Sequence, residues 1–347
     1  MRILFIANSH LNLYKDIEEE LLRQGHQVIT VEDKMFKTDP FYRMGDFAIL
    51  KKGLFKVFNP HNSYWKKKIR KDKRLSDHFD MLLVLSGASI GKYLIEYLEK
   101  TNPNIRKVLY TWDSCTYYDF NRLTHWFDKC YTFDLLDSKS SAFWKLLPIY
   151  YVPSEQLSNV HKEYDLFCIG TNHDGRYSLL KKIIPQLKEN GLKYYIKLVE
   201  QRTNLSLKSK IKYNIIKRFF SSSNEEFIDE MEFVFHADEL NLRSHEIVQR
   251  NEYDKRSSMS HCILDSQREN QSGLTARFIW ALADKQKIAT TNKWVLEYPF
   301  INHGQVCVID KNDPIIPINF MKSSLGEDEV TDVTFLRIDN WVKELLS

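Results

Sequence analysis

The sequence lacks the segments that would take a protein out of the cytoplasm or cross-link it. Its 347 residues include five cysteines, scattered without a C-x-x-C pair, which is typical of buried, reduced thiols. No apolar run reaches the roughly 18 residues of a membrane span. The opening MRILFIANSH has no charged-then-apolar signal-peptide pattern. We therefore expect a cytoplasmic protein, at most attached peripherally to the inner face of the cell membrane.

A strong excess of one charge is also missing. The chain has 50 basic and 46 acidic residues, a formal net charge of +4, and it carries no nucleic-acid-binding motif, so we expect no nucleic-acid partner. It has no G-x-G-x-x-G either, which argues against a dinucleotide cofactor. The length is sufficient for two α/β domains, each with its own core.

Short apolar runs alternate with amphipathic segments along most of the chain. Residues 2–8, 79–87 and 107–114 have the pattern of buried parallel strands, and Leu147–Pro153 is expected to be the last strand of the same sheet. Residues 164–171 and 193–199 begin a second set. This alternation predicts two parallel sheets covered by helices.

The most informative stretch runs from His261 to Asp310. A strand, HCILD, is followed by the polar loop QRENQSG, the helix LTARFIWALADKQ and the strand KIATTN. In such a βαβ unit the helix N-terminus lies at the carboxyl edge of the sheet, where its free N–H groups and its dipole attract an anion. Periodicity alone fits any βαβ unit.

The residues of this stretch resemble a known family. The run LD…Q-S-G-L-T-x-R-x-x-x-A-L-A…K-I-A-T-T-N…Y-P-F is similar to the donor-sugar half of GT-B glycosyltransferases, especially bacterial enzymes that build lipopolysaccharide and capsule. The resemblance extends upstream through YTWDS and YDLFCIGTNHDGR, so it covers about residues 105–310. It implies an α/β fold of two Rossmann-like domains whose parallel sheets face a central cleft.

The resemblance also implies domains and an activity. It places an acceptor-binding domain at residues 1–155, a nucleotide-sugar-binding domain at 163–325, and a terminal segment, 326–347, that packs back on the first domain. The expected reaction moves a sugar from a nucleotide-sugar donor to a lipid-linked or growing bacterial surface glycan. No Asp-x-Asp occurs in the chain, so we expect no metal and no other cofactor. Inversion of the anomeric centre is weakly favoured.

Donor binding is assigned, on the resemblance, to residues around three strand ends. The diphosphate is expected near Gly273–Thr275 and Arg277, with Arg176 as a bidentate clamp, although Arg176 also fits a plain surface arginine. Asp265 and Gln271 are expected to hold the sugar or the ribose. The full donor set is Gly170, Thr171, Arg176, Asp265, Gln271, Ser272, Gly273, Leu274, Thr275, Arg277 and Asn292.

Acceptor binding and proton transfer are assigned to the first domain. Asn8 and Trp112 follow strands and are candidate acceptor ligands, with Trp112 as a stacking platform. Asp113 and His10 are the candidate catalytic bases, since a carboxylate or a histidine with a pKa near neutral can take a proton from a hydroxyl. Asp113 also fits a helix cap, and His10 also fits an ordinary loop residue.

One position departs from the family pattern. The helix after Gly273 usually carries a glutamate that binds the nucleotide ribose, and Trp280 stands there instead. An indole cannot accept hydrogen bonds from two hydroxyls. A non-catalytic binding or scaffold subunit on the same fold is therefore the alternative function.

The most basic segment is Lys51–Arg74, with Asp72 as its only acid. Its aromatic residues, among them Tyr64 and Trp65, are interleaved with the lysines. The pattern fits a solvated face, or a patch that contacts anionic lipid headgroups while the aromatics insert. A second cluster, Lys208–Phe220, has no acid at all.

Overall fold

The protein forms two compact units, and each is described by itself. The N-terminal unit comprises Met1–Val152, Asn270–Leu274 and Thr334–Ser347, and the C-terminal unit comprises Pro153–Glu269 and Thr275–Val333. The computed structural model describes residues 1–8, 13–34, 36, 41, 59–153, 160–199, 207–219, 225–244, 248, 250–268 and 270–347.

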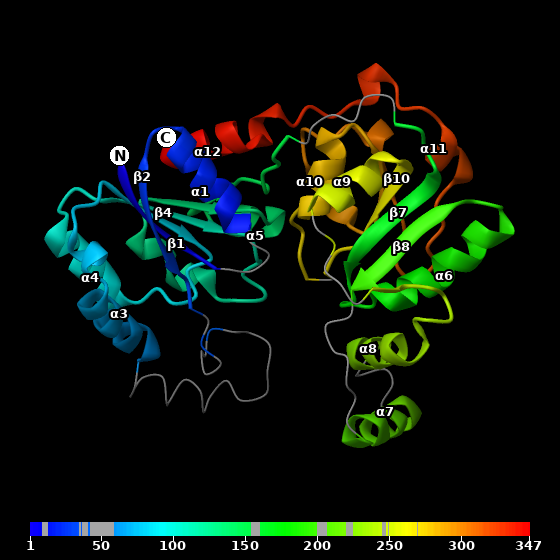
Figure 1. The fold of residues 1–347 in the computed structure, drawn as a ribbon, viewed down its shortest axis with the longest axis horizontal. Helices are drawn as coiled ribbons and strands as arrows, with labels where there is room; N and C mark the ends of the chain where they lie inside the picture. The colour runs from blue at the N-terminus through cyan, green and yellow to red at the C-terminus, as the bar shows by residue number, and fades with distance from the viewer. Residues whose placement is uncertain are drawn as a thin grey trace. The chain divides into compact units, whose positions relative to one another are not determined.

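The N-terminal unit is built on a six-stranded parallel sheet in the order β2-β1-β3-β4-β5-β6 (Figure 1). The strands are β1 (Arg2–Ala7), β2 (Gln27–Glu32), β3 (Met81–Leu85), β4 (Arg106–Thr111), β5 (Lys129–Thr132) and β6 (Trp144–Leu146). The helices are α1 (Leu13–Arg23), α3 (Pro60–Lys71), α4 (Lys92–Thr101), α5 (Leu135–Ser140) and α12 (Ile338–Leu346).

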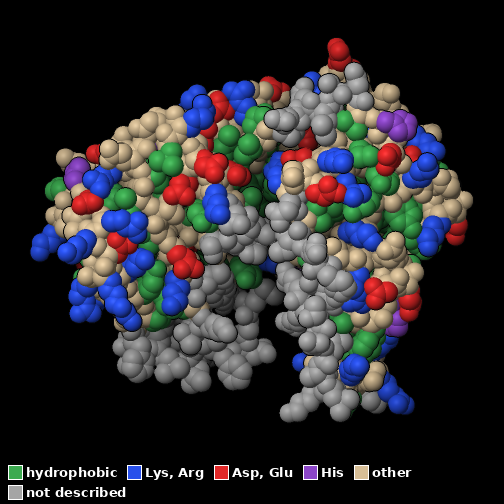
Figure 2. All heavy atoms as spheres, in the orientation of Figure 1, with side chains coloured by type: hydrophobic (Ala, Val, Ile, Leu, Met, Phe, Trp, Pro, Cys, Tyr) green, Lys and Arg blue, Asp and Glu red, His purple; other side chains and the backbone are tan. Residues whose placement is uncertain are grey.

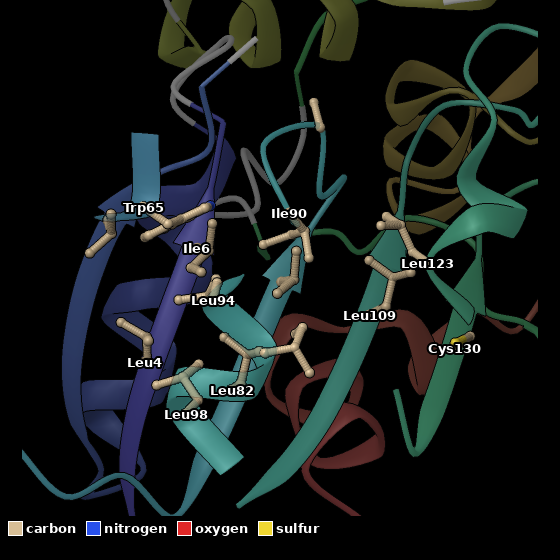
Figure 3. Close-up of a cluster of buried hydrophobic side chains, with 14 of the residues drawn as sticks. Leu4, Ile6, Trp65, Leu82, Ile90, Leu94, Leu98, Leu109, Leu123 and Cys130 are labelled. Atoms are coloured by element: carbon tan, nitrogen blue, oxygen red, sulfur yellow. The ribbon is translucent and has the colours of Figure 1, made fainter. Parts of the chain in front are cut away.

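Burial on both faces explains the apolar strands of this sheet. Side chains of β1, β3 and β4 pack against α3 and α4 in one core cluster (Figure 3). Trp65 of α3 is fully buried there, and its indole N–H donates to the carbonyl of Ser89 at 2.9 Å. The sequence left open whether this indole inserts into lipid. It does not, because it is packed in the core against the sheet.

The last strand of the sheet is shorter and earlier than the sequence suggested. β6 covers Trp144–Leu146, and Leu147–Pro153 is not a strand, apart from a bridge between Tyr151 and Arg337. Pro148 and Pro153 cannot donate to a ladder, which explains why pairing ends here. Instead, the carbonyl of Pro148 accepts a hydrogen bond from the indole of Trp341 in α12.

The C-terminal unit has a second six-stranded parallel sheet, in the order β12-β11-β10-β7-β8-β9. Two parallel sheets with helices confirm the predicted α/β class. The strands are β7 (Tyr164–Thr171), β8 (Tyr194–Val199), β9 (Arg243–Ser244), β10 (Ser260–Asp265), β11 (Lys287–Thr290) and β12 (Val306–Val308). The helices are α6 (Arg176–Glu189), α7 (Leu207–Phe219), α8 (Glu225–His236), α9 (Arg250–Ser258), α10 (Ala276–Ala283) and α11 (Ile318–Lys322).

The expected βαβ unit is present as β10, α10 and β11. Phe278, Ala281 and Leu282 form part of the buried face of α10, as their spacing predicts, whereas Leu274, expected on the same face, precedes the helix. The helix begins at Ala276 because the Thr275 hydroxyl accepts a hydrogen bond from the N–H of Phe278 at 3.2 Å and caps it.

None of the helices in the described ranges is long and apolar enough to cross a membrane.

Candidate functional site

Three neighbouring strands of the C-terminal unit end in small or polar residues at one edge of the sheet. β7 ends with Gly170 and Thr171, β10 ends with Asp265, and β11 ends with Thr290. Because the strands are parallel, these ends lie at the same edge, and α6 and α10, which follow β7 and β10, begin there. The N-termini of two helices therefore lie beside this group of side chains.

Arg176 is the first residue of α6 and is almost fully buried. Its Nε donates to the hydroxyl of Ser266 at 2.6 Å, its Nη2 donates to the Ser266 carbonyl at 3.1 Å, and its Nη1 donates to the carbonyl of Thr171. Burial, together with the nearby charge of Arg277, lowers the pKa of Arg176 to about 10. The guanidinium is thus held rigidly and stays charged at neutral pH.

Arg277 lies in the first turn of α10 and keeps about one fifth of its side chain exposed. Its Nη2 donates to Oδ1 of Asp265 at 3.3 Å and to the Ser266 carbonyl at 3.4 Å. Burial is the largest single influence and opposes its charged form, but Asp265 together with Cys168 and Tyr253 outweighs burial, so the pKa of Arg277 is raised. Asp265 is fully buried and also accepts from the hydroxyls of Thr275, at 2.7 Å, and Thr290, at 3.3 Å.

The two guanidinium groups meet over Gly170. A Cβ built on this glycine would lie 2.7 Å from Nη1 of Arg176 and 3.1 Å from Nη1 of Arg277. Any larger residue would displace at least one of the two side chains. The glycine at the end of β7 is therefore what lets both cations approach the strand end.

The group carries more positive than negative charge. Among the residues that the structure describes, Arg176 and Arg277 face one directly bonded carboxylate, that of Asp265, while the next one, Asp174, is paired with Arg268 at 3.2 Å. Burial raises the pKa of the thiol of Cys168, so this neighbour adds no negative charge at neutral pH. The excess charge favours an anion.

Two buried N–H donors near this edge have no acceptor among the residues that the structure describes. They are Nε of Arg277 and Nδ2 of Asn172, which lies in the loop after β7. A buried donor without an acceptor is costly in a folded protein. Both donors would be satisfied by the oxygen atoms of a bound anion.

The loop from Gln271 to Leu274, expected to bind the diphosphate with Thr275 and Arg277, belongs to the N-terminal unit. There the carboxylate of Asp134 accepts from the backbone N–H of Ser272 at 2.8 Å and of Gly273 at 3.3 Å, and it also accepts from the Ser272 hydroxyl. A Cβ on Gly273 would lie 2.4 Å from the Phe133 ring. These two amides are thus engaged by a side chain of the protein.

The backbone N–H groups of residues 87–89 in the N-terminal unit converge as in an anion-binding loop, and here too a carboxylate of the protein occupies the position of the anion. Ser86 and Gly87 follow β3 with positive φ angles of 73° and 82°. The N–H groups of Gly87, Ala88 and Ser89 all donate to the buried carboxylate of Asp33, at 2.7 to 2.8 Å. This nest of amides therefore orders the loop after β3 by binding Asp33.

The remaining predicted site residues follow other strands of the two sheets. Asn292 follows β11 and caps a short 3₁₀ helix by accepting from the N–H of Trp294 at 3.0 Å. Asn8, Trp112 and Asp113 are half-buried residues of the N-terminal unit, after β1 and β4. His10 lies outside the described residues.

Trp280 packs between two helices. The guanidinium of Arg250 in α9 lies 3.7 Å from the centre of the indole, and Tyr253 contacts the ring edge-on at 5.5 Å. A cation over an indole face is a favourable contact. At the position where the resembling family has a glutamate, this chain thus has a tryptophan that packs α10 against α9.

Ser266, Thr290 and Asp134 were not among the predicted site residues. Ser266 accepts from both arginines, and Thr290 bonds Asp265. Ser266 directly follows the predicted strand 261–265, and Thr290 lies in the predicted strand 287–292, so their positions at strand ends could have marked them. Asp134 follows β5 by two residues and caps α5, and its partners Ser272 and Gly273 lie far away in the sequence.

No metal-binding group of three or more His, Cys, Asp or Glu side chains occurs in the described part of the chain.

The fold, rather than the sequence, connects the chain to known proteins. No protein-family model and no curated protein sequence matches it. A glycosyltransferase from Rickettsia africae aligns with a TM-score of 0.54 and 12% identity, over 99% of this chain and 96% of that one. MurG from Acinetobacter baumannii aligns with a TM-score of 0.43 and 10% identity, over 99% and 94% of the two chains. The first comparison shows a glycosyltransferase-like fold and supports the expected GT-B fold class; the second is too distant to add to it.

Proposed function

We propose that the C-terminal unit binds the diphosphate of a nucleotide-sugar and that the protein transfers the sugar to a glycan acceptor. One observation carries the proposal: Arg176 and Arg277 converge over Gly170 at the N-termini of α6 and α10, and in the described part of the chain one carboxylate, that of Asp265, bonds the pair directly. Such a group supplies the positive charge and the N–H donors that a diphosphate requires.

The same arrangement explains how the reaction would be promoted. When the bond between the anomeric carbon and the diphosphate oxygen breaks, negative charge builds up on the leaving group. Fixed guanidinium groups stabilise that charge without reorganising, which is the role that a metal ion plays in other transferases. Both carboxylate oxygens of Asp265 accept hydrogen bonds from the protein, so we assign it to the orientation of Arg277 and Thr275.

The acceptor hydroxyl must lose a proton as the new bond forms. We assign this step to Asp113 or His10, and Asn8 and Trp112 to acceptor binding. The acceptor that the sequence resemblance supports is a lipid-linked or growing glycan of the bacterial surface, such as lipopolysaccharide or capsule. Asp113→Asn and His10→Ala would each be assayed for turnover, and near-normal rates in both would overturn the assignment of the base.

Donor binding can be tested with a panel of nucleotides. Thermal unfolding would be followed with UDP, GDP, dTDP and CMP, the last as an internal control with one phosphate. At about 100 times its dissociation constant, a bound ligand adds about 2.7 kcal/mol to stability, which raises the melting temperature by several degrees. We expect one nucleoside diphosphate to do this and Arg277→Gln to reduce the shift by about half or more.

The same nucleotide panel distinguishes a glycosyltransferase from the alternative function, a non-catalytic binding subunit. Trp280 favours a non-catalytic binding subunit, because its ring is engaged by Arg250 rather than by a ribose. If no nucleotide shifts the unfolding temperature, while the protein still binds a partner from its own cell, the result supports the non-catalytic subunit and contradicts the proposed transferase.

A further inference from the structure

Helix α7 is basic on nearly every turn. Its thirteen residues, LKSKIKYNIIKRF, include five lysines and arginines and no acid. Such a composition destabilises a helix unless the charges face solvent or an oppositely charged partner. The adjacent helix α8 supplies one such partner, since Glu232 accepts from Lys217 at 2.9 Å.

Two large apolar side chains lie among these charges and face solvent. Ile211 is 54% exposed and Ile215 is 49% exposed. They are four residues apart, so they share one face of the helix. Tyr213 points to the opposite, packed side, where it contacts Phe235. The isoleucine pair is therefore on the outer face and does not contribute to the core.

Basic residues flank the pair on the same outer surface. Lys210 and Lys212 precede and follow Ile211 and are exposed, and Arg218 extends the stripe one turn beyond Ile215. Lys210 makes no ion pair with any described residue, and Lys212 lies over the ring of Phe227 at 4.9 Å. In Figure 2, Lys and Arg side chains gather at the lower end of the C-terminal unit, where Figure 1 places α7.

Helix α3, the described part of the Lys51–Arg74 segment, has the charge but not the exposed apolar residues. Lys67 and Arg70 are exposed, while Trp65 is fully buried and Ile69 is 9% exposed. Tyr64 is half-buried, and its hydroxyl donates to the carbonyl of Glu32 at 3.1 Å, so α3 presents basic charge without a fully exposed apolar side chain beside it. The two basic helices are therefore chemically different.

We propose that the outer face of α7 docks on an anionic lipid surface. Ile211 and Ile215 insert at the boundary between headgroups and acyl chains, and Lys210, Lys212 and Arg218 lie at the level of the lipid phosphates. Nucleic acid fits less well, because the exposed apolar pair is aliphatic, whereas single strands are bound by stacking on aromatic rings. Docking would hold the protein at a membrane independently of what its candidate site binds.

The test is co-sedimentation of the full chain with vesicles of phosphatidylcholine, alone or with added phosphatidylglycerol. We expect binding only to the anionic vesicles. Lys210→Gln should weaken it about fivefold, the usual effect of one basic residue near the surface. Ile211→Ser combined with Ile215→Ser should weaken it about tenfold for each isoleucine, because buried methylene groups are lost.

Matched controls locate the surface. Lys67→Gln makes the same charge change on α3 and should leave vesicle binding unchanged. All of these side chains are exposed, so the variants should melt at the temperature of the parent protein; if the double variant does not, Ile211→Ser alone replaces it.

Three results would overturn the proposal. They are equal binding to neutral and anionic vesicles, parental binding by the α7 variants, and a loss with Lys67→Gln as large as that with Lys210→Gln. Binding to duplex RNA without binding to vesicles would overturn it as well.

Discussion

Arg176 and Arg277 direct their guanidinium groups toward the same glycine, with Nη1 atoms 2.7 Å and 3.1 Å from the position that a Gly170 Cβ would take. Two buried cations repel each other, and Asp265 bonds only one of them directly. The pair is therefore an electrostatic cost to the folded protein unless an anion joins it.

Gly170→Ala should damage the site while keeping its charges. The added methyl group would displace the Arg176 guanidinium, which three hydrogen bonds hold in place. We expect a loss of stability of about 1–3 kcal/mol from overpacking. Diphosphate affinity should fall about tenfold, as for the loss of one charge-assisted hydrogen bond. Calorimetric titration and urea unfolding measure the two effects, and unchanged nucleotide affinity would show that Gly170 is not part of the site.

Asp265→Asn should lower the stability of the free protein while strengthening its binding of an anion. Without the carboxylate the two guanidinium groups have no directly bonded counter-charge, so the free protein should lose about 3–5 kcal/mol. The stabilisation by added pyrophosphate should become larger than in the parent protein, because the site is more positive. Unfolding with and without pyrophosphate tests this, and a smaller stabilisation in the variant would contradict the charge argument.

Asp134→Ala should release the loop that contains Ser272 and Gly273. The carboxylate also caps α5 by accepting from the N–H groups of Leu136 and Asp137, so one substitution removes an acceptor from four backbone N–H groups. Of these, the N–H of Leu136 keeps the Ser272 hydroxyl, at 2.8 Å, as an acceptor. We expect a loss of about 2–4 kcal/mol, more than the roughly 1 kcal/mol of an ordinary helix cap. Asp72→Ala, which removes the cap of a short surface helix, is the matched control.

Amide hydrogen exchange measures how Asp134→Ala affects the loop itself. The N–H groups of Ser272 and Gly273 should exchange much faster in Asp134→Ala and at the parental rate in Asp72→Ala. Equal protection of the two amides in both variants would mean that Asp134 does not hold the loop.

The start of α12 should make stability depend on pH in the acid range. Arg337 forms two hydrogen bonds to Asp339, at 2.6 and 2.8 Å, and this contact lowers the pKa of Asp339 to about 2. A carboxyl with a lowered pKa stabilises the fold above its ordinary pKa of 3.8, and this contribution is lost as the pH falls toward 2. Asp339→Asn should thus be less stable than the parent at pH 6 and equal to it near pH 2.

Urea unfolding across this pH range checks the prediction, with the exposed Glu327→Gln as control. A difference between the parent and Asp339→Asn that persists at the acid end would assign the effect to something other than the ion pair.

The grouping of the arginine pair with Gly170 and Asp265, which the resemblance implied, follows from local order along the chain. Gly170, Asp265 and Arg277 stand at strand ends or at a helix start, and parallel strands bring such positions to one edge of the sheet. The sequence could not show that Ser272 and Gly273 bind Asp134, because that contact joins residues 138 positions apart. It depends on where the folded chain places the loop.

At several positions the sequence fits both an exposed and a buried side chain, and only the packing of the fold distinguishes the two. The alternation of lysine with aromatic residues around Trp65 fits an exposed patch and a core helix equally well, and only packing against the sheet selects the second. Trp280 is similar, because its contact with Arg250 requires α9 to lie against α10. The exposed pair on α7 is the reverse case, in which isoleucines that fit a core lie on the surface.

The most direct test of the account is a calorimetric titration with the nucleoside diphosphate that stabilises the parent protein most. It would be carried out on the parent, on Arg277→Gln, and on Lys188→Gln, a control in the last turn of α6, at the end opposite Arg176. We predict that Arg277→Gln weakens binding by about 10- to 100-fold, the effect of losing hydrogen bonds to a charged group, and that Lys188→Gln has no effect. Equal affinities for the parent and Arg277→Gln would contradict the central claim that this arginine pair binds the donor diphosphate.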